Sequence, residues 1–302
     1  MLPQKILITG ASGFVGSALC NTLEAANYSV IRSSQRLSEA DWSQNLVGVE
    51  TLVHLAARVH MMHDNAADPL AEFRAINLAG TINLARQAAG AGVRQFVFLS
   101  SIGVNGAATE LNKPYTSDDT PAPHSYYAVS KHEAEIGLRE IAIETGMQVV
   151  IIRPPLIYGA NAPGNFGSLL RVIRRGVPLP LGLATHNRRS FVSLNNLVDL
   201  IITCIQHPNA VNQTFLVSDN EDVSTADLLR KMAVAQGIPS RLLPVPVALL
   251  NLCAKLTGKQ AIAQRLLGNL QVDISHTQKL LDWQPIISLE EGLRRAVSQA
   301  LK

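Results

Sequence analysis

The chain has 302 residues, of which 47% are hydrophobic and 16% are charged, so it can form one large domain or two coupled ones. Its net charge of +3 comes from scattered basic residues, which gives no indication of a nucleic-acid partner or a membrane-surface partner. The three cysteines lie in apolar helical contexts without metal-site spacing, which favours a reduced, cytoplasmic protein. The amino terminus does not have the pattern of a signal peptide.

Residues 5–16, KILITGASGFVG, indicate a buried strand that turns sharply into a helix. Glycine allows a positive φ at such a turn, and it lets a diphosphate approach the backbone N–H groups at the helix N-terminus. Gly10, Gly13 and Gly16 therefore predict a dinucleotide-binding turn. A tight strand–helix turn without a ligand is the alternative interpretation.

A second strand is expected at residues 29–31, and no acidic residue follows it to hold the adenosine ribose. Arg32 stands there instead, and a guanidinium suits the oxygens of a 2′-phosphate. This favours NADP over NAD, unless Arg32 is only a solvated surface residue. Residues 37–50 are polar and give no clear third strand.

Residues 51–58 predict the next central strand, whose small end, Ala56–Ala57, lets a cofactor approach the backbone. His54 is interpreted as a packed strand residue rather than a catalyst. His60 and His63 lie near Asp64, but no further ligand has suitable spacing, so we expect no metal site.

Residues 68–91 predict a long helix in which Asn77 lies on an otherwise apolar face, and this favours a buried polar role for Asn77. The following strand, at 95–100, ends in Ser100 and Ser101. Ligands gather at the carboxyl ends of parallel strands, so these hydroxyls are expected to point towards the site.

Tyr127 and Lys131 lie four residues apart at the start of a helix, so both project from one helical face. A tyrosine with a pKa near ~10 is a poor base at neutral pH. The ammonium of Lys131, together with a positive nicotinamide ring, would favour the phenolate and lower that pKa. Tyr127 is therefore a candidate general base or acid beside a hydride donor.

The remaining elements carry little chemistry. A buried strand at 148–153 is closed by Pro154–Pro155, and a further strand is expected at 213–217. Helices are expected at 225–236, 246–268 and 290–301. The apolar run 245–254 is too short to span a bilayer.

Several motifs together are specific: TGASGFVG, HLAAR, residues 76–81, FLSSIGVNG, YYAVSK, RPPLIYG and RRSFVSLNNLVD. They resemble the extended short-chain dehydrogenase/reductases, and within these the NAD-dependent epimerase/dehydratase family, over nearly the whole chain. The resemblance implies an α/β fold, with a Rossmann-type doubly wound parallel sheet and a smaller C-terminal α/β substrate domain. The NAD(P)-binding domain would take 1–160 and about 189–224, and the sugar-nucleotide domain 161–188 and 225–302.

The resemblance also implies roles for individual residues. As catalytic residues, Ser101 would orient the sugar hydroxyl, Tyr127 would exchange its proton and Lys131 would hold the nicotinamide ribose. The implied cofactor-binding residues are Gly10, Ser12, Gly13, Phe14, Val15, Gly16, Arg32, Leu55, Ala56, Ala57, Asn77, Ser100, Tyr127, Lys131 and Pro154. The implied substrate-binding residues are Ser101, Tyr127, Asn165, Arg189 and, as a looser match, Arg265. A bidentate guanidinium is well suited to a diphosphate.

Three departures from the family pattern narrow the activity. No acidic residue stands where the family binds the adenosine ribose, which leaves the choice between NAD and NADP open. Asn105 replaces a tyrosine near the substrate. Ile102 and Gly103 stand where 4,6-dehydratases carry an aspartate and a glutamate. Isoleucine and glycine cannot act as acid and base, so a dehydratase is rejected.

Two reactions at C4 of a UDP-hexose or UDP-N-acetylhexosamine remain. We expect a UDP-sugar 4-epimerase, in which hydride leaves C4 and returns to the other face. The alternative is an NADPH-dependent 4-ketoreductase of a UDP-4-keto-6-deoxy-N-acetylhexosamine. A second alternative is a non-catalytic NAD(P)-binding regulator, although the intact catalytic residues argue against it. The implied setting is surface-polysaccharide synthesis, and the helices at 68–91 and 126–145 suggest a homodimer.

Overall fold

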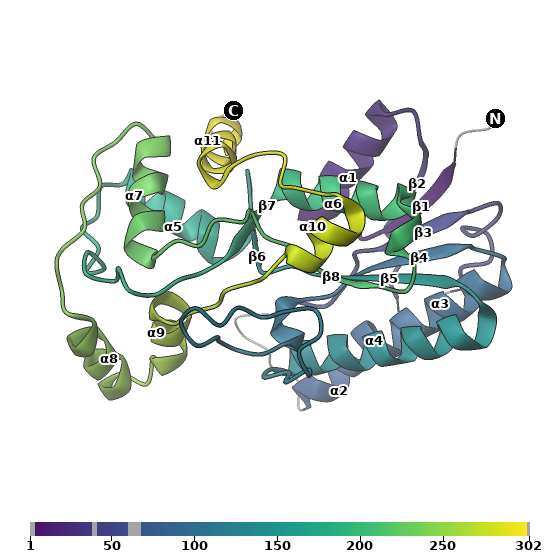
Figure 1. Cartoon of the computed structure of the whole chain (residues 1–302), viewed down its shortest axis with the longest axis horizontal. Coiled ribbons are helices and arrows are strands. Elements are labelled where there is room, and N and C mark those ends of the chain that lie inside the picture. The colour runs from purple at the N-terminus through teal and green to yellow at the C-terminus, as the bar shows by residue number, and fades with distance from the viewer. Residues whose placement is uncertain (1–3, 38–40, 60–67, 301–302) are drawn as a thin grey trace.

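The computed structural model describes residues 4–37, 41–59 and 68–300. At its centre lies a six-stranded parallel sheet in the order β2-β1-β3-β4-β5-β8 (Figure 1). The strands are β1 Lys5–Thr9, β2 Ser29–Ser33, β3 Thr51–His54, β4 Gln95–Leu99, β5 Gln148–Arg153 and β8 Thr214–Leu216. The expected doubly wound parallel sheet is confirmed, and the described residues of 34–50 add no strand to it.

Helices cover both faces of the sheet because its central strands are apolar on both sides. One face carries α1 Phe14–Ala25, α6 Leu194–Gln206 and α10 Ser275–Leu281, and the other carries α2 Pro69–Phe73, the π-helix η1 Arg74–Ala79, α3 Gly80–Gly90 and α4 Tyr126–Thr145 (Figure 1). Two short 3₁₀ segments are η2 Ile102–Val104 and η3 Pro208–Ala210.

A second, smaller unit is built around a two-stranded parallel sheet beside the main one. Its elements are β6 Leu156–Tyr158, β7 Phe191–Ser193, α5 Asn165–Arg174, α7 Thr225–Ala235, α8 Val247–Leu256, α9 Gln260–Leu267 and α11 Leu289–Ala300. Residues 270–283 pack on the main sheet rather than in this unit, because Leu270, Ile274 and Trp283 belong to the core cluster that contains Ile8. The exact domain ranges stay a prediction.

Three expected elements differ from the structure. The single helix predicted for 246–268 is wrong, because Gly258, at a φ of 67°, separates α8 from α9. The strand predicted for 51–58 ends at His54, and the chain beyond it leaves the sheet. The helix predicted for 68–91 is interrupted in its middle by the π-helix η1. No helix among the described residues is both long and apolar enough to cross a membrane.

Candidate active site

The candidate site lies at the carboxyl edge of the parallel sheet. The glycine turn follows β1, Leu55 follows β3, Ser100 follows β4 and Pro154 follows β5. Backbone hydrogen bonds join these loops: Leu55 N donates to Thr9 O at 3.3 Å, and Ile102 N donates to Pro154 O at 2.9 Å. Residues far apart in sequence thus meet at the edge where ligands of such sheets bind.

The glycine turn needs its glycines for packing. Gly10 has a φ of 68°, and a Cβ on it would lie 2.8 Å from Ala56 N. A Cβ on Gly16 would collide with Gly10 O, the same carbonyl that accepts a hydrogen bond from Gly13 N at 2.9 Å. Leu55 and Ala56 therefore lie directly against the turn, and the approach of a cofactor to the backbone at Ala56–Ala57 stays a prediction.

The start of α1 fits a diphosphate. Gly13, its N-cap, gives no side-chain hydrogen bond, and the first turn carries no acid. By contrast, serine side chains cap α4, α6 and α7. Ser12 and Gly13 are exposed, whereas Phe14 and Val15 are at least partly buried and anchor the helix. The N–H groups and positive dipole end of α1 are thus available to an anionic group.

Substituting glycines with alanine should separate strain from helix propensity. We expect Gly10→Ala to lower the free energy of unfolding by at least about 2 kcal/mol, since the added Cβ meets backbone at a positive φ. Gly90→Ala, in helix α3 with nothing within 4 Å of the added Cβ, should instead be neutral or stabilise slightly. Urea unfolding curves measure both, and equal losses would contradict the assignment of strain to Gly10.

Arg32 is held by an acidic neighbour. Its Nε and Nη2 donate to the two carboxylate oxygens of Glu24 at 2.8 and 2.6 Å, and Nη2 also donates to Asn21 Oδ1 at 2.8 Å. All of this lies on the exposed surface of α1 and β2. A 2′-phosphate would have to compete with or share this pair, so the preference for NADP stays a prediction.

His54 is a packed strand residue, as predicted. It is fully buried, with Nδ1 2.6 Å from Thr9 Oγ1 and Nε2 3.0 Å from Thr81 Oγ1. Burial lowers the pKa of His54 well below its usual value, so the ring is neutral. Its role is to join β3 to β1 and α3.

Asn77 has the buried polar role that its position predicted. It is 1% exposed, and its amide binds both the N–H and the carbonyl of Arg58, at 2.8 and 3.0 Å. Its Nδ2 also donates to Ser130 Oγ, which in turn donates to Tyr127 O. Asn77 therefore ties the loop after β3 to the first turn of α4, and its contact with a cofactor stays a prediction.

The three predicted catalytic residues come from two adjoining segments. The Ser125 hydroxyl caps α4 by accepting from Ala128 N, which sets Tyr127 in the first turn. Lys131 Nζ donates to Leu99 O at 2.8 Å. Ser101 Oγ accepts from Gly103 N at 3.1 Å.

Gly103 shows how near Ser101 lies to α4. A Cβ placed on Gly103 would be 3.3 Å from Ser101 Oγ and 3.4 Å from Ala128 Cβ. The serine hydroxyl therefore faces the turn of α4 that carries Tyr127. Ser101 and the first turns of α4 are thus neighbours at the carboxyl end of β4.

Burial sets the charge of the tyrosine and the lysine. It raises the pKa of Tyr127 to about 12, and it lowers the pKa of Lys131 to about 7 against an opposing effect of Glu135. The sequence predicted a lowered tyrosine pKa beside a lysine ammonium and a nicotinamide ring. Within the chain itself the pKa of Tyr127 is raised instead, because burial of the phenol disfavours its charged form. Tyr127 is thus a protonated phenol at neutral pH.

A buried ion pair behind the site was missed by sequence reasoning. Arg153 binds Glu135 through Nε and Nη2 at 2.9 and 2.5 Å, with both side chains almost fully buried. Ser100 Oγ also donates to Glu135 at 2.5 Å, and Arg153 Nη1 donates to Asn105 Oδ1 at 3.0 Å. Asn105 thus has a structural partner, and Glu135 joins α4 to the ends of β4 and β5.

A signal for this pair was present in the sequence. Glu135 follows Lys131 by four residues, on the face of α4 that packs on the sheet. Arg153 ends an otherwise apolar strand. Because an unpaired buried charge is costly, an acidic residue on the buried face of a helix and a basic residue at the end of a buried strand predict an ion pair.

The substrate-binding candidates lie beyond the sheet edge. Arg189 is partly buried and donates to Gly268 O at 3.2 Å, and burial lowers its pKa. Among the described residues its guanidinium pairs with this backbone carbonyl and with no carboxylate, so its contact with a substrate diphosphate stays a prediction. Arg265 lies exposed on α9. Asn165 begins α5, and its side chain lies outside what the structure describes.

Metal binding finds no support in the described part of the chain, where no group of three or more potential ligands occurs. His60, His63 and Asp64 lie outside the described residues.

The comparisons with known proteins agree with this geometry. Residues 6–218 match the model of the NAD dependent epimerase/dehydratase family. The chain belongs to the NAD dependent epimerase/dehydratase family. It is 44% identical to the UDP-glucose 4-epimerase of Vibrio cholerae, over all of this chain and 97% of that protein.

Two solved structures share the fold and carry different cofactors. UDP-glucuronic acid 4-epimerase from Bacillus cereus, in complex with NAD, is 20% identical, with a TM-score of 0.79 over 99% of this chain and 100% of that one. RMD from Pseudomonas aeruginosa, complexed with NADPH, is 21% identical, with a TM-score of 0.78 over the same shares. The family is thus NAD-dependent by description, and its fold is found with either dinucleotide.

Proposed function

We propose that this protein is a UDP-sugar 4-epimerase that uses NAD or NADP. The proposal rests on two observations: the glycine turn and Ser101 follow strands of the same parallel sheet at its carboxyl edge, and Lys131, one helical turn from Tyr127, donates to Leu99 O at that edge. The 44% identity to a UDP-glucose 4-epimerase over the whole chain supports the choice of reaction. Ile102 and Gly103 supply no acid or base for dehydration.

In this proposal the chain's residues bind, orient and move a proton. The start of α1 holds the dinucleotide diphosphate, and Arg189, with Arg265 and Asn165, holds that of the sugar nucleotide. Ser101 accepts or donates a hydrogen bond at the C4 hydroxyl, and Tyr127 exchanges its proton. Lys131 lies one helical turn from Tyr127, at the position expected to hold the nicotinamide ribose. The nicotinamide, when bound, supplies the acceptor and donor of hydride.

The test of this function is product analysis. UDP-glucose or UDP-N-acetylglucosamine incubated with the purified protein should yield its C4 epimer, identified by NMR, without net consumption of added dinucleotide. Conversion of a UDP-4-keto-6-deoxy sugar with stoichiometric oxidation of NADPH, and no epimerisation, would select the ketoreductase instead. Dinucleotide binding without either reaction would select the regulator.

The cofactor preference rests on Arg32. If it holds a 2′-phosphate, Arg32→Gln should weaken NADPH binding about tenfold and leave NADH binding nearly unchanged, because only NADPH carries that phosphate. Arg36→Gln, at a neighbouring exposed arginine, is the matched control. Calorimetric titration of both dinucleotides measures this. Equal effects on NADPH and NADH, or a wild-type preference for NADH, would contradict the role.

We also propose a cytoplasmic homodimer that acts in surface-polysaccharide synthesis. All three cysteines are free, which suits a reducing compartment. Ile136 and Ile143, seven residues apart on one stripe of α4, are 44% and 86% exposed, which suits a helix that pairs with a second copy. A monomer mass in solution at micromolar concentration would count against the dimer.

A further inference from the structure

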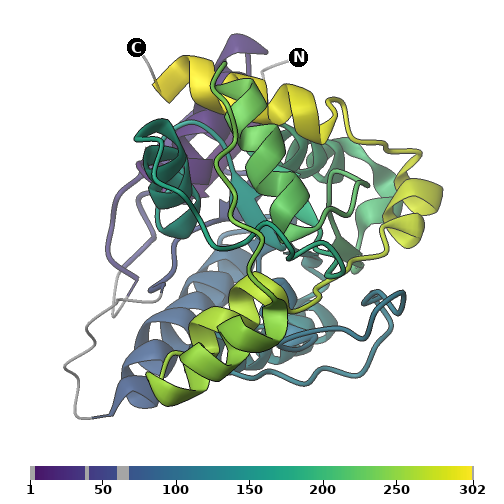
Figure 2. The same cartoon turned by 90° about the vertical axis from the view of Figure 1, so that its left-hand side faces the viewer.

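Helices α8 and α9 form a hairpin with almost no buried surface. Neither helix contains a fully buried residue. In Figure 1 the hairpin lies at the end of the molecule farthest from the amino terminus, and in Figure 2, which faces that end, it lies towards the viewer. Its inner side is attached, since Val247, Leu250 and Leu267 pack partly buried against the core of the smaller unit. The hairpin is thus a fixed part of the fold.

The outer side of α8 is an apolar stripe that faces away from the protein. Leu249, Leu252, Cys253 and Leu256 follow the i, i+3, i+4, i+7 spacing of one helical face. Leu256 is 78% exposed, Leu252 52% and Leu249 49%. On α9, Ile262 is 55% exposed. An amphipathic helix normally has one apolar face, which packs on the core. Helix α8 has in addition a second apolar face that is exposed to solvent.

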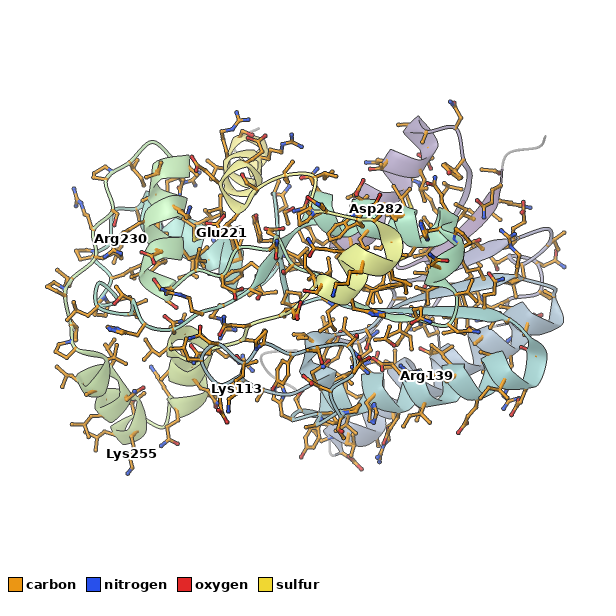
Figure 3. All side chains as sticks on the ribbon, in the orientation of Figure 1. Lys113, Arg139, Glu221, Arg230, Lys255 and Asp282 are labelled. Atoms are coloured by element: carbon orange, nitrogen blue, oxygen red, sulfur yellow. The ribbon has the colours of Figure 1, made fainter. Side chains whose placement is uncertain are left out.

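The charge around this stripe has one sign. Residues 246–268 contain Lys255, Lys259 and Arg265 and no acidic residue. Figure 3 shows Lys255 at the tip of the hairpin, pointing away from the body of the molecule. The nearby loop carries Glu110, but its carboxylate is paired with Lys113 at 2.5 Å. The hairpin therefore presents exposed leucines flanked by basic side chains.

We propose that the α8–α9 hairpin docks on the surface of an anionic lipid bilayer, with the stripe of α8 at the headgroup level. Exposed apolar residues flanked by lysines are typical of helices that lie in the membrane interface without spanning it. Anionic headgroups would neutralise Lys255 and Lys259. A second copy of the chain fits less well, because a symmetric contact through these hairpins would bring like charges together with no acid in them.

The position of the hairpin couples docking to the candidate site. Asn187 Nδ2 donates to Leu266 O and Gly268 O at the end of α9, and Arg189 Nη1 donates to the same Gly268 carbonyl. A docked hairpin would therefore hold the segment that carries Asn187 and Arg189 close to the bilayer surface. This inference does not depend on which sugar the site accepts.

Vesicle co-sedimentation of the full chain tests the proposal. The wild type should bind vesicles of phosphatidylglycerol mixed with phosphatidylcholine, and added salt should weaken binding. The double substitution Leu252→Ser and Leu256→Ser should reduce affinity by about tenfold per leucine. Lys255→Glu with Lys259→Glu should reduce it by about tenfold or more. Both pairs are exposed, so the variants should fold.

Val234→Ser is the matched control, because Val234 is 71% exposed on α7, away from the hairpin. It should bind anionic vesicles like the wild type. The proposal is overturned if the wild type does not bind them, or if the hairpin variants bind as well as the control. It is also overturned if analytical ultracentrifugation shows a dimer that the leucine substitutions dissociate, because the stripe would then be a contact between copies.

Discussion

Tyr127→Phe should reduce kcat about 10³-fold, since only the phenol oxygen of this residue can exchange the proton of the reacting hydroxyl. Burial raises the pKa of Tyr127 to about 12, so the wild-type side chain holds its proton at neutral pH. The ring itself packs edge-on to Phe73, with centroids 6.2 Å apart, and phenylalanine keeps that contact. Steady-state turnover of the UDP-sugar and calorimetric binding of the dinucleotide measure the two properties separately.

Tyr126→Phe is the matched control for this substitution. Tyr126 precedes the candidate base in the same helical turn, but its side chain is 53% exposed. Turnover of this variant should stay close to that of the wild type, and both variants should bind the dinucleotide with nearly the wild-type affinity. Undiminished turnover in Tyr127→Phe would remove Tyr127 from the mechanism.

Glu135→Ala should lower the free energy of unfolding by about 3–5 kcal/mol, because it leaves the guanidinium of Arg153 buried without its carboxylate partner. The Ser100 hydroxyl also loses its acceptor. Both effects act inside the region that joins α4 to the ends of β4 and β5. Urea unfolding followed by circular dichroism measures the loss.

Glu133→Ala, two residues earlier on α4, provides the comparison. Glu133 forms an equally short ion pair with Arg74, at 2.5 Å, but this pair lies at the surface and should contribute about 0–1 kcal/mol. Comparable losses for the two alanine variants would show that burial does not decide the strength of the Glu135–Arg153 pair.

The predicted elements succeeded where short-range spacing carried the signal. The glycines at 10, 13 and 16 and the interval between Tyr127 and Lys131 are local patterns, and the structure places all of these residues at one edge of the sheet. The helix expected over 246–268 failed, because its apolar periodicity continues across Gly258 although the backbone does not. Periodicity reports which residues are apolar and gives little information about where a chain bends.

Partners from distant elements could not be predicted in this way. The sequence shows that Arg32 follows the second strand, but only the fold brings Glu24 of α1 within 2.6 Å of its guanidinium. The same holds for Arg153 and Glu135, which come from a strand and a helix. Their pairing depends on how α4 packs over β5, which is a tertiary contact.

The sequence by itself determined the family and the doubly wound sheet, because strand–turn–helix motifs encode their own backbone geometry, and it supplied the site residues that stay a prediction. Only the tertiary structure decided the charge states of Tyr127 and Lys131 and the exposure of one apolar face of α8. Burial raises the pKa of Tyr127 and lowers that of Lys131, and burial is a property of the packed molecule. The sequence likewise showed only that the apolar run 245–254 is too short to span a bilayer, whereas the packed structure shows that Leu249, Leu252 and Leu256 of α8 are exposed.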